Sequence, residues 1–237
     1  MSNPTETAYH EFQHAYDWFN KTLFDTQLPP CLITLQREKQ TYGYFSFNRF
    51  VSGSGDKTDE IALNPIYFSV CPPEETMQTL VHEMCHLWQF RFGKPGRRGY
   101  HNKEWGNKME YVGLMPSSTG KQGGKKTGDK VADYIIKGGR FENVCNELFS
   151  SGFKITWSDK YPARNKIIEA INNGTISEMQ EQLSEWGVEI TESGEIILEN
   201  QTKQTRNKYI CPSCEIQVWG KPNLNISCCD CNIKLEQ

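Results

Sequence analysis

The pattern H-E-x-x-H at residues 82–86 constrains the fold of this chain more than any other feature. The surrounding run TMQTLVHEMCHLWQFRFG is helical in pattern, and prolines lie before it at 72–73 and after it at 95. Residues four apart on a helix share one face, so His82 and His86 project to the same side. The flanking residues are mostly apolar: Leu80, Val81, Met84, Leu87 and Trp88. The chain must therefore bury most of this helix and still provide partners for two stacked histidines.

The chemistry of the pattern favours a metal site. Two imidazoles one turn apart can bind one Zn²⁺ at about 2.0–2.1 Å. Glu83 sits one step round the helix, where its carboxylate reaches a water molecule on the metal rather than the metal itself. Zinc lowers the pKa of such a water to about 7, and a nearby carboxylate can take its proton. The spacing predicts His82 and His86 as zinc ligands and Glu83 as catalytic base; the alternative is a pair of ordinary surface histidines.

His101 is the predicted third ligand. A catalytic zinc takes three protein ligands and keeps one position open. His101 begins a second helical stretch, HNKEWGNKMEYVGL, after the turn GKPGRRGY, which lets that helix fold back toward the first. Glu104, one turn later, could orient a ligand or be an ordinary helix charge. The other pair with helical spacing, His10 and His14, is expected to belong to the core or the surface.

The runs around this helix predict an α+β fold. Apolar residues recur at helical spacing over about residues 7–24. Three strand-like runs follow, CLITLQR, YGYFSFNRF and DEIALNPIYF, and the turn VSGSGDKTD predicts a hairpin between the last two. The prediction is an N-terminal helix and a small antiparallel sheet packed against the H-E-x-x-H helix. An edge strand of that sheet could hold a substrate peptide in extended form. Residues 115–130, rich in glycine and lysine, are predicted to form a long loop.

The cysteines predict a second metal site. The chain has nine, and five of them lie within residues 211–231. Two C-x-x-C knuckles with thirteen residues between them are typical of a closed tetrahedral zinc site of the ribbon type. The knuckle spacing favours Cys228 over Cys229 as a ligand, without deciding between them, and a disulfide-bonded tail is the alternative. The predicted ligands are Cys211, Cys214, Cys228 and Cys231. Together with the histidines they predict two zinc ions per chain, one catalytic and one structural.

Composition indicates a class of protein but no particular partner. The chain has 237 residues, a formal charge of −3 and a hydrophobic fraction of 37%, which are values of a soluble globular protein. Its apolar runs are far shorter than the roughly 20 residues of a membrane span. The N-terminus lacks the basic start and apolar core of a signal peptide. We therefore expect a cytoplasmic protein without a membrane partner; nothing in the sequence indicates its oligomeric state.

Residues 91–130 are basic although the whole chain is acidic. This window carries ten lysines and arginines against three acidic residues. Basic side chains among glycines suit contact with phosphates, and DNA is the partner that they favour. A solvated loop is the alternative. The residues predicted to contact nucleic acid are Arg97, Arg98, Lys121, Lys125 and Lys126.

Several segments of the sequence resemble the SprT-like metalloprotease family. They are HEMCH, the fourteen-residue gap before His101, the following HNKEW, the opening WFNKTLFDTQLPP, and the C-terminal ribbon. The resemblance covers about residues 7–115 and, separately, the ribbon; residues 116–205 carry no motif of the family. It implies a minimal zincin-like domain in which His82, His86 and His101 bind zinc and Glu83 is the catalytic acid and base. It also implies proteolysis of proteins bound or crosslinked to DNA, as in the eukaryotic members.

These expectations define domains and a function. A peptidase domain is expected over residues 1–186, with its core at about 7–115 and an extension at 116–186. A linker at 187–207 and a zinc ribbon at 208–237 follow. The expected activity is zinc-dependent hydrolysis of peptide bonds in a protein or peptide substrate. The rival is a non-catalytic DNA-binding or transcription-associated protein with two structural zincs, for which Glu83 would have no use.

Overall fold

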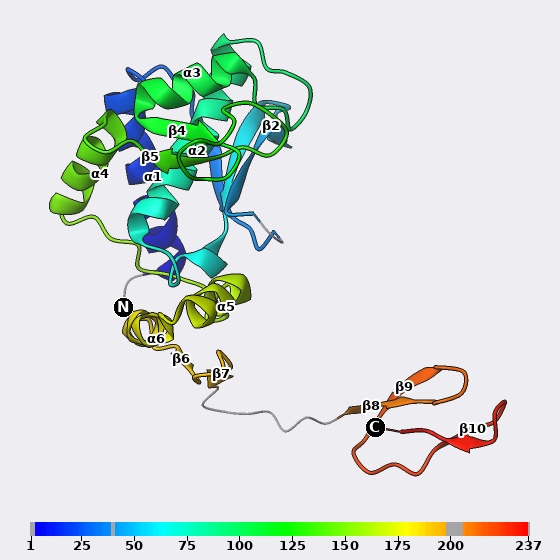
Figure 1. Ribbon diagram of the computed structural model, residues 1–237. Helices are drawn as coiled ribbons and strands as arrows, with labels where there is room; N and C mark the ends of the chain where they lie inside the picture. Colours follow the sequence, from blue (N-terminus) through cyan, green and yellow to red (C-terminus); the bar gives the residue numbers. More distant parts are fainter. Residues whose placement is uncertain (1–2, 39–40, 198–205, 237) are drawn as a thin grey trace. The chain divides into compact units, whose positions relative to one another are not determined.

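A computed structural model of the protein describes residues 3–38, 41–197 and 206–236 (Figure 1). The chain divides into two compact units, Met1–Ile196 and Ile197–Gln237. Helices and small sheets both occur, so the predicted α+β class is confirmed. Residues 198–205, which belong to the predicted linker, lie outside the described residues.

A three-stranded sheet forms one layer of the first unit. Its strands are β1 (Leu32–Leu35), β2 (Gly43–Val51) and β3 (Lys57–Leu63), in the order β1-β3-β2. The hairpin of β2 and β3 is antiparallel as predicted, but β1 runs parallel to β3. The prediction of an antiparallel sheet was therefore wrong for one strand. The reason is that the chain reverses both between β1 and β2 and between β2 and β3, so β3 runs in the direction of β1 and, by inserting between the two earlier strands, becomes its neighbour.

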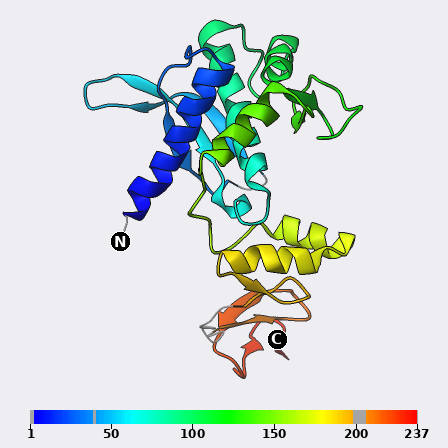
Figure 2. The same ribbon diagram turned by 90° about the vertical axis from the view of Figure 1, so that its left-hand side faces the viewer.

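Helix α2 (Pro73–Phe92) lies at the centre of the unit. It packs against β2 and β3 on one side and against α3 (Lys103–Val112) on the other, while α1 (Pro4–Leu23) lies beside it (Figures 1 and 2). Its sequence explains this position, because apolar side chains occupy more than one face. The buried residues of α2 are Thr76, Met77, Leu80, Val81, Glu83, Met84, Cys85, Leu87 and Gln89.

Two predicted segments differ in detail. The third strand-like run ends at Leu63, and a 3₁₀ helix (Pro65–Tyr67) follows because Asn64 caps it: the Asn64 side chain accepts from Ile66 N. The predicted long loop is shorter than expected. Its start forms β4 (Leu114–Ser117), which pairs with β5 (Ala132–Ile135) after the loop.

The last helices of the first unit form two groups. Helix α4 (Arg140–Ser150) packs on α1. Helices α5 (Arg164–Asn173) and α6 (Ile176–Glu185) form an apolar cluster with the turn before α2. The short pair β6 (Glu189–Ile190) and β7 (Ile196–Ile197) adds to the same cluster, in which Ile190 is buried. The N-terminal part of the predicted linker therefore lies within the first unit.

The second unit is a small set of β-ribbons. Strand β8 (Asn207–Ile210) pairs with β9 (Gln217–Gly220), and β10 (Ser227–Cys228) pairs with β11 (Ile233–Lys234). Its buried cluster consists of Tyr209, Cys211, Cys228 and Leu235. A core of this size cannot stabilise a fold alone, which is why such modules depend on a metal.

None of the helices in the described part of the chain combines the length and the apolar character of a membrane span.

Candidate functional site

The three predicted histidines lie together. Helix α2 places His82 and His86 one turn apart, with ring centroids 5.2 Å from each other. His101 enters from the segment before α3, and its Nε2 lies 3.2 Å from Nε2 of His86. One ligand nitrogen of each histidine lies within 4.8 Å of the others. The turn at residues 93–100 therefore folds the chain back as the sequence predicted.

Backbone pairing fixes the orientation of His101. His101 N donates to Gly128 O at 2.8 Å, and Gly128 N donates back to His101 O at 3.1 Å. Nδ1 of the ring lies 3.2 Å from the same Gly128 oxygen, which assigns the proton to Nδ1 and leaves Nε2 for a metal. Gly128 has φ of +147°, a conformation that favours glycine. The loop between β4 and β5 thus positions His101, a predicted ligand that precedes this loop in the chain.

Trp105 forms the floor of the cluster. Its ring centroid lies 4.9 Å from His82, 5.1 Å from His86 and 4.4 Å from His101. The Trp105 side chain is fully buried. The Asn102 side chain caps α3 by accepting from Trp105 N at 3.1 Å. The indole therefore shields the histidines on one side.

Asp133 orients His82, a role that sequence patterns did not predict. Its Oδ1 lies 2.8 Å from Nδ1 of His82. Gln78, one turn before His82, donates to Oδ2 at 2.7 Å and to the backbone oxygen of Asp133 at 2.9 Å. Carboxylates that accept from a ligating histidine fix its tautomer and orientation. Asp133 lies on β5, beyond the region that carries family motifs, so only the fold reveals it.

The described residues fit a zinc ion. Burial, helped by the positive charge on His82, lowers the pKa of His86 well below its usual range and that of His101 to about 4, so both are neutral at pH 7. Burial also lowers the pKa of His82, but its hydrogen bond to Asp133 and the carboxylate of Glu83 outweigh this and raise it. Neutral imidazoles are the form that binds metal, so His86 and His101 are ready to bind, whereas His82 releases a proton when the ion binds. A set of three nitrogens is typical of catalytic zinc sites.

Glu83 lies beside the histidines without joining them as a ligand. Burial raises its pKa to about 7, and the nearby His82 and the backbone N–H of Phe45 partly oppose this. A carboxylate whose pKa lies near the working pH is suited to take and return a proton.

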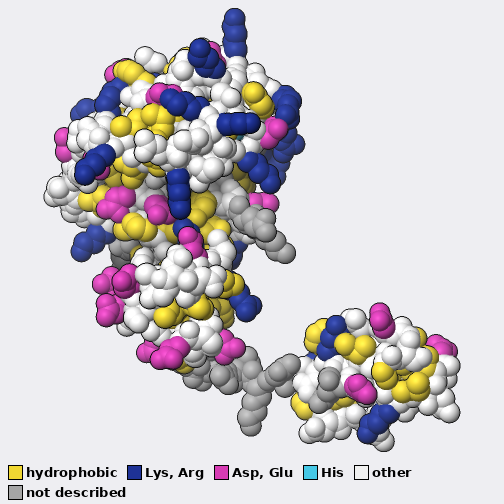
Figure 3. Space-filling model, in the orientation of Figure 1, with side chains coloured by type: hydrophobic (Ala, Val, Ile, Leu, Met, Phe, Trp, Pro, Cys, Tyr) yellow, Lys and Arg dark blue, Asp and Glu magenta, His cyan; other side chains and the backbone are white. Residues whose placement is uncertain are grey.

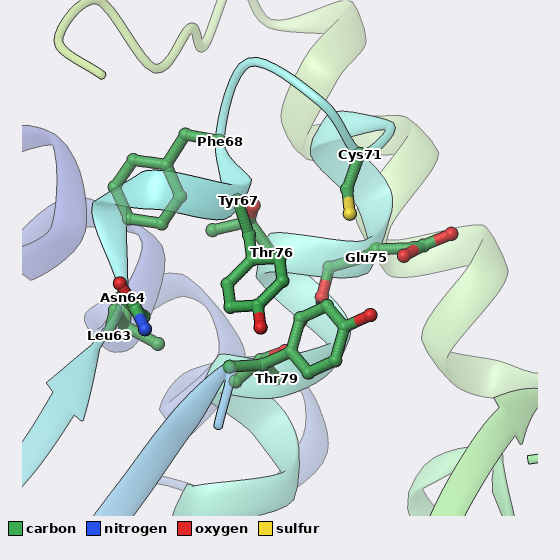
Figure 4. A pocket seen from close by; sticks show the side chains of 9 residues that line it. Leu63, Asn64, Tyr67, Phe68, Cys71, Glu75, Thr76 and Thr79 are labelled. Atoms are coloured by element: carbon green, nitrogen blue, oxygen red, sulfur yellow. Dashed lines mark hydrogen bonds between the residues drawn. The ribbon is translucent and has the colours of Figure 1, made fainter. Parts of the chain in front are cut away.

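A large cleft opens over Glu83. Its volume is about 1780 Å³, and β2, α2 and the loops around residues 95–101 and 118–121 line it. A second cavity, at the N-terminal end of α2, measures about 10 Å³ and holds at most one water (Figure 4). Tyr67, Cys71 and Glu75 line this small space. The large cleft is therefore the one that can hold a substrate.

Glu104 and the exposed pair His10 and His14 lie outside the cluster of three histidines. Glu104 Oε2 accepts from Gln89 Nε2 at 2.8 Å and from Lys94 N at 2.7 Å, so it closes the turn between α2 and α3. It contacts none of the three histidines among the interactions that the structure shows. His10 and His14 are exposed on α1, which agrees with the surface alternative.

The four predicted cysteines also converge. One sulfur of each of Cys211, Cys214, Cys228 and Cys231 lies within 4.8 Å of the others. Cys229 is exposed and outside the group, so the structure favours Cys228, as the spacing did. Backbone N–H groups of Cys214 and Ser213 lower the pKa of Cys211 to about 7, which favours the thiolate that a metal needs.

The basic residues do not form a single surface. Arg97, Arg98 and Lys121 line the cleft, whereas Lys125 and Lys126 lie outside it. Arg97 pairs with Asp129 at 2.7 Å, and Lys126 pairs with Glu110 at 2.9 Å. Lys and Arg side chains gather on the upper part of the first unit in Figure 3, while acidic ones gather over α5 and α6. Three of the five predicted residues are thus placed where they could meet a ligand of the cleft.

Removing the carboxylate of Asp133 is expected to weaken zinc binding. Asp133→Ala leaves Nδ1 of His82 without its acceptor, so zinc affinity should fall about 10- to 100-fold. Competition with a zinc chelator measures this directly. Asp56→Ala, which changes an exposed carboxylate in the turn between β2 and β3, is the control and should leave the affinity unchanged. Equal zinc affinity of the Asp133 variant and the wild type would contradict the orienting role.

Comparisons with known proteins identify a family and a relative. A model of the SprT-like family matches residues 12–122. An uncharacterized protein in the mucB 3′ region of Salmonella typhimurium is 64% identical over 59 residues, which are 24% of this chain and 80% of that protein. No solved structure matches the chain. The matched region includes the three histidines and Glu83, whereas Asp133 and the four predicted cysteine ligands of the ribbon lie outside it.

Proposed function

We propose, since the chain belongs to the SprT-like family, that it is a zinc-dependent peptidase. The observation that carries this proposal is the cluster of three histidines beside the buried carboxylate of Glu83, on the wall of a large cleft. The group contains no fourth ligand among the described residues. An open position is what separates catalytic zinc from structural zinc, and it favours an enzyme over the non-catalytic rival.

The described residues divide the work of peptide hydrolysis. His82, His86 and His101 would hold the zinc, which when bound polarises the scissile carbonyl and acidifies water. Glu83 takes the proton of the attacking water and passes it to the leaving amine. Asp133 and Gly128 keep the ligand rings in place, and the indole of Trp105 shields them.

The substrate is a polypeptide in extended form. Strand β2 is an edge of its sheet, and the cleft runs along it. An edge strand offers backbone N–H and C=O groups to which an extended peptide can add as a further strand. Folded proteins do not present such a segment, so we propose unfolded or locally open proteins as substrates.

DNA-bound or DNA-crosslinked proteins are the narrower class that we propose. Arg97, Arg98 and Lys121 supply positive charge at the cleft. In the ribbon, Trp219 is 64% exposed on β9 opposite Lys208, whereas Tyr209 is buried. An exposed indole beside a lysine can stack on an unpaired base while the lysine contacts a phosphate.

Cleavage of an unfolded protein tests the proposed activity. The zinc-loaded chain should degrade a protein without stable fold, and chelation of the zinc should abolish this. Single-stranded DNA should accelerate cleavage of a DNA-binding substrate at low salt and lose this effect as salt rises, because phosphate contacts release counterions. Cleavage that persists fully after complete zinc removal would contradict the peptidase proposal; acceleration that ignores salt would contradict the DNA-linked one.

A further inference from the structure

Three phenylalanines form an aromatic shelf in the cleft, which we define as Phe45, Phe47 and Phe90. The ring centroids of Phe45 and Phe90 are 5.4 Å apart, and those of Phe47 and Phe90 are 4.9 Å apart at an angle of 27°. All three line the cleft that contains His86 and Glu83. Phe47 and Phe90 are 44% and 42% exposed and stack on each other, so their apolar surface is contiguous. The shelf therefore offers apolar surface to whatever occupies the cleft.

A buried charge holds the shelf in shape. Asp59, on β3, is fully buried and accepts from the backbone N–H of Asn48 at 2.8 Å. It also accepts from Arg91 of α2 at 2.6 Å. Arg91 in turn lies over the ring of Phe47, with 5.1 Å between the guanidinium carbon and the ring centroid. Loss of the partly exposed Arg91 would leave the buried Asp59 carboxylate without its cation, so this ion pair holds the guanidinium over Phe47.

The shelf lies a short way along the cleft from the metal site. Phe90 follows His86 by one helical turn, which is about 6 Å along the axis. An extended peptide covers about the same distance in two residues. Strand β2 and helix α2 run in the same direction. Three successive contacts show this: Gly43 lies beside Thr79, the N–H of Phe45 faces Glu83, and Phe47 stacks on Phe90.

The opposite end of the cleft has a different character. Glu74, Glu75 and Glu169 line it, together with Lys166. Charged side chains at that end offer little to an apolar group. Tyr42, whose ring lies beside Lys166, is the aromatic exception at that end, so a peptide in the cleft would gain most of its apolar contact on the shelf side of the reacting bond.

We infer that the aromatic shelf is a specificity subsite of the proposed peptidase, which receives a large apolar side chain within two residues of the scissile bond. This inference rests on the proposed function. A side chain such as phenylalanine or leucine would cover the exposed faces of Phe47 and Phe90 and remove them from water. Such a contact favours the apolar residue over glycine at that position by about 10- to 100-fold.

Binding to an inactive variant tests the subsite without relying on catalysis. Zinc-loaded Glu83→Gln is titrated with fluorescent peptides that carry phenylalanine, leucine, glycine or aspartate at one scanned position. We expect a preference of about tenfold or more for the apolar peptides, and its loss when Phe47→Ala or Phe90→Ala is added. Phe92→Ala is the matched control, because Phe92 is 54% exposed on the same helix but does not line the cleft.

Cleavage-site mapping by wild-type protein separates the two proposals. Mass spectrometry of a digested peptide mixture should show apolar residues enriched within two positions on one side of the cut. Cleavage without such enrichment, together with equal binding of all peptides, would overturn the subsite and leave the peptidase intact. Absence of any cleavage with the binding preference retained would instead overturn the peptidase. A preference that survives both alanine variants would also overturn the subsite.

Discussion

Replacing Glu83 by glutamine is expected to lower peptide cleavage by about 10²- to 10⁴-fold while zinc content stays the same. Glutamine keeps the length and shape of the side chain but cannot take a proton at neutral pH. The ligand cluster does not include Glu83, so its three nitrogens remain available to the metal. The rate of cleavage at saturating substrate and the zinc content of the purified protein measure the two effects separately.

Two further variants show whether the loss is specific. His101→Ala removes one of three ligands, so activity and the zinc of this site should disappear together. His10→Ala changes an exposed histidine of the other pair with helical spacing and should alter neither. If Glu83→Gln cleaves a substrate as fast as the wild type, the assignment of Glu83 as proton acceptor is wrong.

Loss of the ribbon ligands is expected to unfold the second unit alone. Cys211→Ser combined with Cys228→Ser removes two of four thiolates and two of the four side chains in the small buried cluster. Metal binding of such sites contributes about 10–16 kcal/mol, which far exceeds what this core can provide. Zinc content should fall from two ions to one per chain, and residues 206–236 should become open to proteases. Thermal unfolding of the first unit should not change, because the two units are separate clusters of contacts.

Cys229→Ser is the control for the ribbon. Its thiol is exposed and lies outside the group of four, so zinc content and protease resistance should equal those of the wild type. A double cysteine variant that keeps two zinc ions and an intact ribbon would contradict the predicted structural zinc site. A fall in zinc content with Cys229→Ser would show that Cys229, and not Cys228, binds the metal.

The sequence predicted those features that depend on local spacing. The positions of His82 and His86 follow from helical periodicity, and the cysteine knuckles follow from their own spacing. The approach of His101 needed only a short turn rich in glycine and proline. Each of these features involves residues within about twenty positions of one another, where the geometry of a helix or turn decides the contact.

Features that depend on distant pairing escaped prediction. Asp133 meets His82 across 51 residues, because β5 returns beside α2. The parallel pairing of β1 depends on where β3 inserts, which no local pattern encodes. The aromatic shelf also needs the tertiary fold, since Phe47 and Phe90 come from different elements. Strand-like periodicity identified Phe45 and Phe47 as strand residues but could not show that they face the cleft.

Residues 128–133 are synthesised after the histidines that they support. Gly128 and Asp133 hold two of the three ligand rings, and both follow the residues matched by the family model. A chain still emerging from the ribosome carries all three histidines before it carries either support. We therefore expect the histidine cluster to reach its full zinc affinity only after β5 has paired with β4, so that a nascent chain binds zinc more weakly than the finished protein.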